Sequence, residues 1–450
     1  MISLRYLLGL IPDTAAIERK EAKLLKEYNE LQAFQQSEEL KRYEELKAFV
    51  NSPEFKVRKK KILSQKFKDT KEYAELQRFI ALKKSPKVKN YFKVLHSHEY
   101  AEYEAIQKSG EYADPSSLDE ATRKSKRYQA YQKFIQSPAF KLFQSYVESG
   151  EHAEYEKLEA YIASDEFRKV KEYMELPSFR KWEQSEEYRQ LQEYLSLRKS
   201  EKIKWYYAVK DSKKFDRLKT WKVVFEDDFD GQSVNREKWL TRYYWGEVML
   251  HDAYSLVSEK QCNTDGQNLE ISGSVLKIIL RKEKATGKSW DPEHGFFPRD
   301  FDYTGGLINS GKSFAGQHGK IKAKIRVTAG QAGTHAFCLM SQRIVPHLDV
   351  FKYENGKFSM NYFWGTDSSQ QKIKRFGAKK IENNFFIYEI EWTPEQIIWK
   401  INGLEIRRQK DSLPAEPMYL YFGSSLYHDP ENLSLPATME IDWVRWYQKE

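Results

Sequence analysis

The feature that most constrains the fold of this 450-residue chain is the placement of its glycines. Of 21 glycines, only Gly9, Gly110 and Gly150 precede residue 221. Glycine supplies the positive-φ conformations of tight turns and weakens helix interiors, so its absence over long stretches favours helices and its abundance favours strands joined by turns. The chain therefore divides into a helical half and a half of strands and turns, and its length agrees with two or more domains.

Charge divides at the same place. Residues 1–220 contain 45 Lys and Arg against 36 Asp and Glu, whereas residues 221–450 contain 30 of each, so the net charge of +9 belongs to the helical half. Residues 51–100 alone hold 14 basic and 5 acidic side chains. Segment 56–93 is a candidate for binding nucleic acid, an anionic lipid surface or an acidic protein face, but a solvated lysine-rich surface is the favoured interpretation.

The cysteines and the N-terminus bear on the cellular compartment. Only Cys262 and Cys338 are present, which allows at most one disulfide. The apolar run MISLRYLLGLIPD is interrupted by Arg5 and lacks a basic region before it and a small-residue cleavage site after it. No stretch of about 18 apolar residues predicts a transmembrane helix. We expect a cytoplasmic protein, with export by another route as the alternative.

Residues 1–218 are predicted to form short amphipathic helices. Leucine and aromatic residues recur at helical spacing, and serine followed by proline marks helix starts, because the serine side chain caps the first turn and proline fits its first position. Serines also recur at intervals of 15 and 12 residues, as at 37, 52 and 64. This pattern predicts degenerate helix-hairpin repeats stacked into a solenoid or an irregular bundle, which we expect to bind a protein partner. The Ser-Pro pairs are Ser52-Pro53, Ser85-Pro86 and Ser137-Pro138.

Residues 219–450 are predicted to form an antiparallel β-sandwich. Short apolar alternations bounded by Gly, Asn, Asp and Pro recur through this half. They read KVVFEDDFDG, VLKIILRKE, GKIKAKIRV, FIYEIEW, IIWKING, MYLYFG and MEIDWVRWY. About 230 residues suit one large jelly-roll domain.

Several of these segments, in this order, resemble glycoside hydrolase family 16, the laminarinase-like jelly rolls. FEDDFDG followed by EKW is similar to the opening strand of that family, and YTGGLINS with HGKIKAKIRV is similar to its central strands. YEIEWTPEQIIWKING resembles its late hairpin, and EIDWVRWYQ resembles its closing strand. The combination covers nearly all of residues 221–450. No family is assigned to the helical half.

The resemblance implies a catalytic strand of pattern Glu-x-Asp-x-x-Glu, in which a β-bulge brings all three side chains onto one face. Retaining hydrolysis needs one carboxylate as nucleophile and a second, about 5 Å away, as acid and base. The aligned residues are His347, Asp349 and Lys352, so only the central aspartate remains. A lysine holds its proton too tightly to serve as the acid. We therefore predict a pseudo-enzyme.

Three nearby residues extend this hypothesis. Cys338 stands where the family usually has a tryptophan, and Phe363 stands where a histidine often precedes Trp-Gly. Glu354, two residues past Lys352, is the one candidate for restoring activity, but it is displaced by about 7 Å along the strand. A zinc site at His347 and Asp349 is not predicted, because zinc needs a third or fourth ligand that the sequence does not nominate.

Two kinds of binding site remain as expectations. Trp245, Tyr362 and Trp364 are candidate platforms on which a sugar ring stacks, although burial in the core is the favoured alternative. The resemblance also implies a structural calcium ion on the convex face, with Asp228 and Asp442 in the ligand positions. Asp228 departs from the family's usual glutamate.

Three functions follow in order of preference. The first is a catalytically inactive glycosidase-like scaffold that binds proteins, with the helical repeats as its assembly module. The second is a non-catalytic protein that binds glycans in the old substrate cleft. The third is an active hydrolase of β-glucans or galactans with a rebuilt site.

Overall fold

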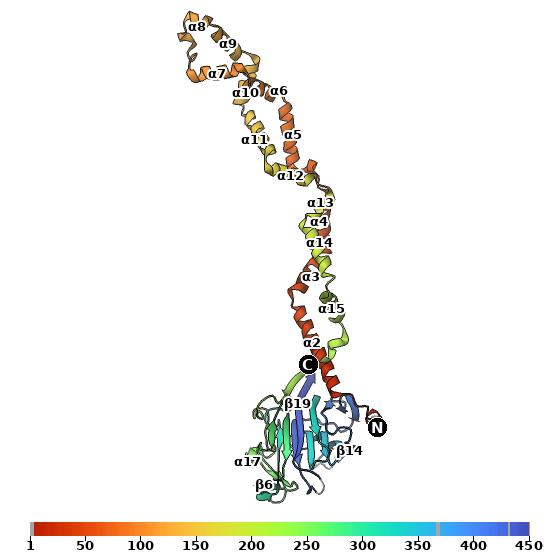
Figure 1. The fold of residues 1–450 in the computed structure, drawn as a ribbon. Coiled ribbons are helices and arrows are strands. Elements are labelled where there is room, and N and C mark those ends of the chain that lie inside the picture. The colour runs from red at the N-terminus through yellow and green to blue at the C-terminus, as the bar shows by residue number, and fades with distance from the viewer. Residues whose placement is uncertain (1–3, 366–369, 431–432, 450) are drawn as a thin grey trace. The chain divides into compact units, whose positions relative to one another are not determined.

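The computed structural model describes residues 4–365, 370–430 and 433–449 (Figure 1). The chain forms two compact units, of which one contains residues 34–208 and the other contains residues 1–33 together with 209–450. The sequence placed the domain boundary at 218/219 and assigned the first 33 residues to the helical domain. By its contacts, this first segment groups with the strands. The expected class, short helices followed by an antiparallel β-sandwich, is confirmed.

The helical unit runs outward along one series of helices and returns along another. The outgoing helices are α3 (Glu38–Val50), α4 (Pro53–Ser64), α5 (Lys71–Lys84), α6 (Pro86–Leu95) and α7 (His98–Ser109). After α8 (Glu120–Lys124), the returning helices are α9 (Lys126–Ile135), α10 (Pro138–Glu148), α11 (Glu151–Ala163), α12 (Asp165–Glu175), α13 (Ser178–Glu183), α14 (Glu186–Leu197) and α15 (Glu201–Val209). Figure 1 shows the resulting pairs, α3 with α14, α4 with α13, α5 with α11, α6 with α10 and α7 with α9.

Serine caps explain why the helices are short, and all three Ser-Pro predictions are confirmed. Ser52, Ser85 and Ser137 each accept a hydrogen bond from the backbone amide three residues later, at 3.1, 3.2 and 3.1 Å. Only Asn51 and Ser52 separate α3 from α4. Junctions this short change the direction of the chain without reversing it. Consecutive helices such as α3 and α4 therefore do not form the stacked hairpins of the solenoid alternative, and the most extensive pairings, such as α6 with α10 and α3 with α14, join helices distant in sequence.

Aromatic side chains pack between the paired helices. The cluster between α6 and α10 contains Tyr91 and Phe143, whose rings stack with centroids 5.3 Å apart and planes 8° apart. Tyr155 of α11 lies in the same cluster and is 3% exposed. Burying aromatic rings is the largest apolar contribution that such short helices can make.

Two antiparallel sheets form the sandwich. The 8-stranded sheet has the order β17 (Leu404–Gln409), β16 (Ile397–Ile401), β15 (Phe386–Trp392), β10 (Gly319–Val327), β19 (Ala437–Lys449), β5 (Leu276–Leu280), β4 (Leu269–Ile271), and β1 (Trp221–Asp227) pairs with β19. The 6-stranded sheet has the order β14 (Gln370–Gly377), β13 (Lys357–Trp364), β12 (His347–Glu354), β11 (Thr334–Met340), β18 (Tyr419–Ser425), β9 (Leu307–Asn309).

Two smaller strand groups complete this part of the chain. One contains β2 (Ser255–Leu256), β6 (Ala285–Asp291) and β7 (Gly295–Phe301), and the other contains β3 (Gln261–Asn263) and β8 (Tyr303–Gly305). The main core lies between the two large sheets, because alternate residues of facing strands point inward. Its largest fully buried members include Trp239, Trp392, Trp399 and Trp446.

The first 33 residues join the sandwich through α1 (Leu4–Leu7) and α2 (Thr14–Gln35). Tyr6 is 3% exposed, belongs to the main core and donates a hydrogen bond from its hydroxyl to the carbonyl of Gly377 at 3.0 Å. Asn402 donates to the carbonyl of Pro12 at 2.7 Å. Glu18 forms an ion pair with Lys324 of β10 at 2.9 Å. These contacts are the physical reason why residues 1–33 group with the strands. Among the described residues, no helix has the length and apolarity needed to cross a bilayer.

Candidate functional site

Strand β12 carries the three residues predicted at the catalytic positions, and it has the expected bulge. Phe337 of β11 pairs with Phe351, but the next residue, Cys338, pairs with Asp349, so Val350 is the extra residue of the bulge. Val350 and Phe351 both lie in the core between the sheets. The bulge therefore lets Asp349 and Lys352 share the opposite face, although they are three residues apart.

Asp349 is held by its neighbours on this face. His347 Nε2 lies 2.7 Å and Cys338 Sγ lies 3.1 Å from Asp349 Oδ1, while Asn361 Nδ2 donates to Oδ2 at 2.6 Å. Burial raises the pKa of the Asp349 carboxyl, but the charge and hydrogen bond of His347, aided by Lys352 and Asn361, outweigh it and bring the pKa to about 2. Asp349 is therefore an anion at neutral pH and has no proton to donate.

Cys338 is the member of this group that sequence reasoning missed. The sequence marks Cys338 only as a departure from the family's tryptophan. In the structure Cys338 pairs with Asp349 across the two strands, and its thiol donates a hydrogen bond to the Asp349 carboxylate. Burial, with the charge of Asp349, raises the pKa of the thiol well above its ordinary value, so the sulfur stays protonated. A protonated, buried thiol is a poor nucleophile. The signal that could have revealed the contact was strand pairing between β11 and β12.

Aromatic side chains cover the neighbouring part of this face. Cys338 and Met340 of β11 pack with Tyr419 and Tyr421 of β18, and the covering residues come from segment 243–256 and from β6 and β7. Beneath them, Glu259 is fully buried, accepts a hydrogen bond from Tyr243 at 2.7 Å and from Ser425 at 3.0 Å, and its pKa is raised by burial. The buried Glu259 carboxyl group thus links the covering segment at Tyr243 to Ser425 of β18 through hydrogen bonds.

Glu354, the candidate for restoring activity, lies at the far end of β12. It accepts a hydrogen bond from Thr334 at 3.3 Å. It also lines a cavity of about 340 Å³ together with His428 and Asp429, which follow β18. Glu354 therefore lines a separate cavity and does not belong to the hydrogen-bonded group around Asp349.

The three predicted sugar platforms differ in exposure. Trp364 is half-buried, and its ring stacks on Tyr362 with centroids 4.7 Å apart and planes 20° apart. Tyr362 is 1% exposed and donates its hydroxyl to the carbonyl of Ser412, so it supports the Trp364 ring and has no free face of its own. Trp245 is half-buried and packs edge-on against Trp290. Sugar binding at Trp245 and Trp364 stays a prediction.

Both predicted calcium ligands are occupied by basic side chains. Asp228 accepts from Arg445 at 2.7 Å, and Asp442 forms an ion pair with Lys324 at 2.7 Å. Calcium would have to displace an arginine and a lysine, and the charge of Lys324 is also shared with Glu18. A structural calcium ion therefore stays a prediction.

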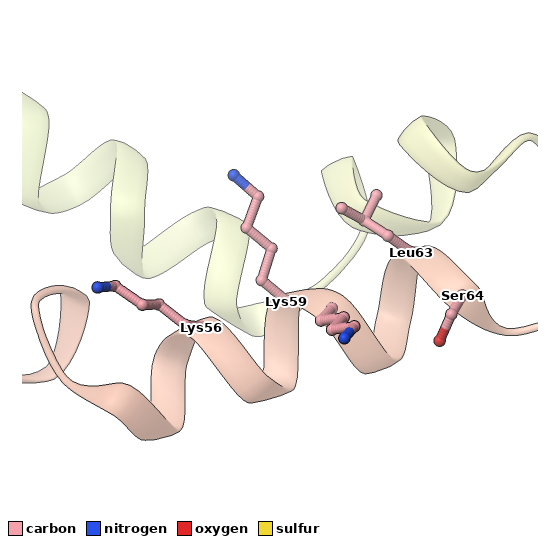
Figure 2. Close-up of a pocket in the computed structure, with 5 residues that line it drawn as sticks. Lys56, Lys59, Leu63 and Ser64 are labelled. Atoms are coloured by element: carbon pink, nitrogen blue, oxygen red, sulfur yellow. The ribbon is translucent and has the colours of Figure 1, made fainter.

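In the helical unit, the basic segment forms a shallow hollow. Figure 2 shows Lys56, Lys59, Leu63 and Ser64 along α4, and with Lys60 they line a volume of about 390 Å³. The ammonium of Lys59 lies 5.1 Å from the centre of the Trp182 ring. Several lysines on one helix face form a positive surface, and binding of a polyanion to segment 56–93 stays a prediction.

The bulged strand, its surviving aspartate and the two-sheet architecture now allow a comparison with known proteins. Residues 256–445 match the model of Glycosyl hydrolases family 16. The resemblance predicted from the sequence is confirmed for this part of the chain. The match spans the end of β2 to β18 and most of β19, and it begins well after the helical unit ends.

The individual proteins to which this half of the chain is similar are distant. The Crh-like protein CRH12 of Candida albicans is 28% identical over 118 residues, which are 24% of this chain and 23% of that protein. A beta-glucanase of Rhodothermus marinus is 23% identical over 277 residues, which are 53% of this chain and 88% of that protein. The laminarinase catalytic domain of Thermotoga petrophila is 18% identical with a TM-score of 0.43, and the likeness covers 52% of this chain and 99% of that one. The chain thus spans about a quarter of the length of the first relative.

Proposed function

We propose that this protein is a glycosidase-like scaffold without hydrolytic activity, whose helical unit is its assembly module. One observation carries the proposal. The bulge that positions catalytic carboxylates in such a strand is present at Val350, but its face displays His347, Asp349 and Lys352. Retaining hydrolysis requires a carboxylate nucleophile and a carboxylic acid about 5 Å apart, and these three positions hold a single carboxylate, Asp349, that is already ionised.

The helical unit supports the second half of the proposal. Its described surface carries apolar side chains in water, including Phe179 at 59% exposure, Val57 at 66% and Leu142 at 39%. Burying such side chains under a partner stabilises the complex by roughly 25 cal/mol per Å² of apolar surface buried. A scaffold of this kind would join a glycosidase-like sandwich to a protein-binding helical unit.

Restoring the carboxylates tests the catalytic part of the proposal. The variant His347→Glu/Lys352→Glu recreates the pair on the bulged strand, and each single variant recreates one member. We expect a trace of hydrolysis of β-1,3-glucan from the double variant and none from either single variant, because each role depends on the other. The double variant His347→Gln/Lys352→Gln is the matched control. Activity in either single variant, or equal activity in the control, would contradict the proposal.

Glycan binding is the second candidate, and the partly exposed Trp364 ring favours it. A relative of the sandwich is named a beta-glucanase, so β-glucan oligosaccharides are the suitable probes. Calorimetric titration of the full chain with laminari-oligosaccharides should give binding that Trp364→Ala weakens by about 1 to 3 kcal/mol, the usual range for loss of a stacked ring. Equal affinity in Trp364→Ala would exclude this platform.

A further inference from the structure

Three different metal-binding groups converge on the face of β12. The Cys338 sulfur, the His347 imidazole and the Asp349 carboxylate each offer one donor atom, and these atoms all lie within 4.8 Å of one another. Oδ1 of Asp349 is the centre of the group, since it is 2.7 Å from Nε2 of His347 and 3.1 Å from Sγ of Cys338. Cys338 comes from β11, and the other two come from β12.

Surrounding residues fix the orientation of Asp349. Asn361 of β13 donates to Oδ2 at 2.6 Å and to the hydroxyl of Ser359 at 3.0 Å. The indole of Trp399 donates to the backbone carbonyl of Asp349 at 2.9 Å. Because Oδ2 is occupied, Oδ1 is left to face the sulfur and the imidazole. Outer contacts of this kind orient the ligands in known metal sites.

We propose that Cys338, His347 and Asp349 bind a late first-row divalent metal ion, with Zn²⁺ as the best-matched species. Thiolate, imidazole and carboxylate are the three ligand types that zinc takes in proteins, and three protein ligands leave a fourth position for water. Calcium and magnesium are poor candidates, because they prefer sites made of oxygen alone. The third ligand that the sequence did not nominate is Cys338.

The charges of the site are compatible with such an ion. On binding, the S–H bond of Cys338 breaks and its proton passes to solvent, the proton on Nε2 of His347 that faces Asp349 also leaves that nitrogen, and metal–sulfur and metal–nitrogen bonds form. Thiolate and carboxylate then neutralise the two positive charges of the ion. Lys352, which interacts electrostatically with both Asp349 and Cys338, consequently faces a neutral centre and not a cation.

The geometry requires only small adjustments. With metal–ligand bonds of about 2.0 to 2.3 Å, tetrahedral ligand atoms stand roughly 3.3 to 3.6 Å apart. The present donor separations differ from this by on the order of 1 Å, which side-chain rotation can supply. The His347 side chain is 23% exposed, whereas that of Asp349 is 2% exposed, so an ion enters from the imidazole side.

Metal titration of the chelator-treated full chain tests the proposal. Calorimetry with Zn²⁺ should give one site per chain, and Co²⁺ should give a thiolate-to-cobalt charge-transfer band. Cys338→Ser should abolish that band, and His347→Ala should weaken Zn²⁺ binding at least tenfold. Asn361→Ala should lower the affinity for Zn²⁺ about 10- to 100-fold, because Asn361 orients the Asp349 carboxylate. The matched control is Cys262→Ser, which alters the other buried free cysteine and should change neither readout.

Several binding results would overturn the site. They are the absence of Zn²⁺ binding, a cobalt complex without the thiolate band, unchanged affinity in His347→Ala, and loss of binding in Cys262→Ser. Melting curves of the metal-free variants separate a lost ligand from a lost fold, because Zn²⁺ should raise the Tm of the wild type but not that of a folded Cys338→Ser protein. A folded Cys338→Ser variant that Zn²⁺ still stabilises would equally contradict the proposal.

Discussion

Replacing Tyr6 tests whether the start of the chain belongs to the sandwich. Tyr6 is 3% exposed, its ring lies edge-on to Phe376 at 5.7 Å, and its hydroxyl bonds to the carbonyl of Gly377. Removing a buried aromatic ring costs about 3 to 5 kcal/mol in the free energy of unfolding. Tyr6→Phe keeps the ring and removes one hydrogen bond, so it should cost only about 0.5 to 1.5 kcal/mol.

Urea unfolding of the full chain, followed by tryptophan fluorescence, measures these costs, since the largest buried tryptophans lie in the sandwich. Tyr6→Ala should lower the sandwich midpoint most, and Tyr6→Phe should lie between it and the wild type. Leu8→Ala is the matched control on the same segment, because Leu8 is 63% exposed, and it should change stability by less than about 0.5 kcal/mol. Equal stability of Tyr6→Ala and Leu8→Ala would refute the assignment of residues 1–33 to the sandwich.

Three further predictions concern the rest of the chain. Ser137→Ala should destabilise the helical unit by about 1 kcal/mol in circular dichroism melts, whereas Ser196→Ala, exposed inside α14, should not. Burial lowers the pKa of His335 to about 4, so its contribution to the free energy of unfolding is complete above the unfolded pKa of 6.5 and falls by about 3 kcal/mol as the pH drops from 6.5 to 4. His335→Gln should remove this pH dependence of the free energy of unfolding. An unchanged pH dependence in that variant would contradict the prediction. If segment 56–93 binds a polyanion, its affinity for heparin or single-stranded DNA should fall steeply as the salt concentration rises. Binding that does not depend on salt would contradict this prediction and favour a solvated surface.

The elements with strong local signals were predictable from the sequence. The three Ser-Pro pairs begin helices because a capped first turn is decided by neighbouring residues alone. The predicted strands such as GKIKAKIRV and FIYEIEW are β10 and β15, whose alternation reflects one buried face. The bulge before Lys352 followed from the family resemblance and is present.

Long-range pairing was not predictable in the same way. Helix spacing does not reveal that α3 packs on α14, since short helices with similar aromatic residues fit several partners. The role of Tyr6 was missed because one tyrosine in a short apolar run has no periodic pattern. Cys338 was recognised as unusual, but its contact with Asp349 depends on the register between β11 and β12. Tyr362 and Trp364 looked equivalent as aromatics, and only burial distinguishes them.

The most direct test of the central claim is turnover by the unmodified protein. The full chain should be incubated with β-1,3-glucan, β-1,4-glucan and galactan, and the release of reducing ends should be followed over long times against an enzyme-free blank. Because the three catalytic positions of the bulged strand hold a single carboxylate, Asp349, which is ionised, we expect no hydrolysis above the blank. Clear hydrolysis that Asp349→Asn or Glu354→Gln abolishes would contradict the account and establish a rebuilt active site.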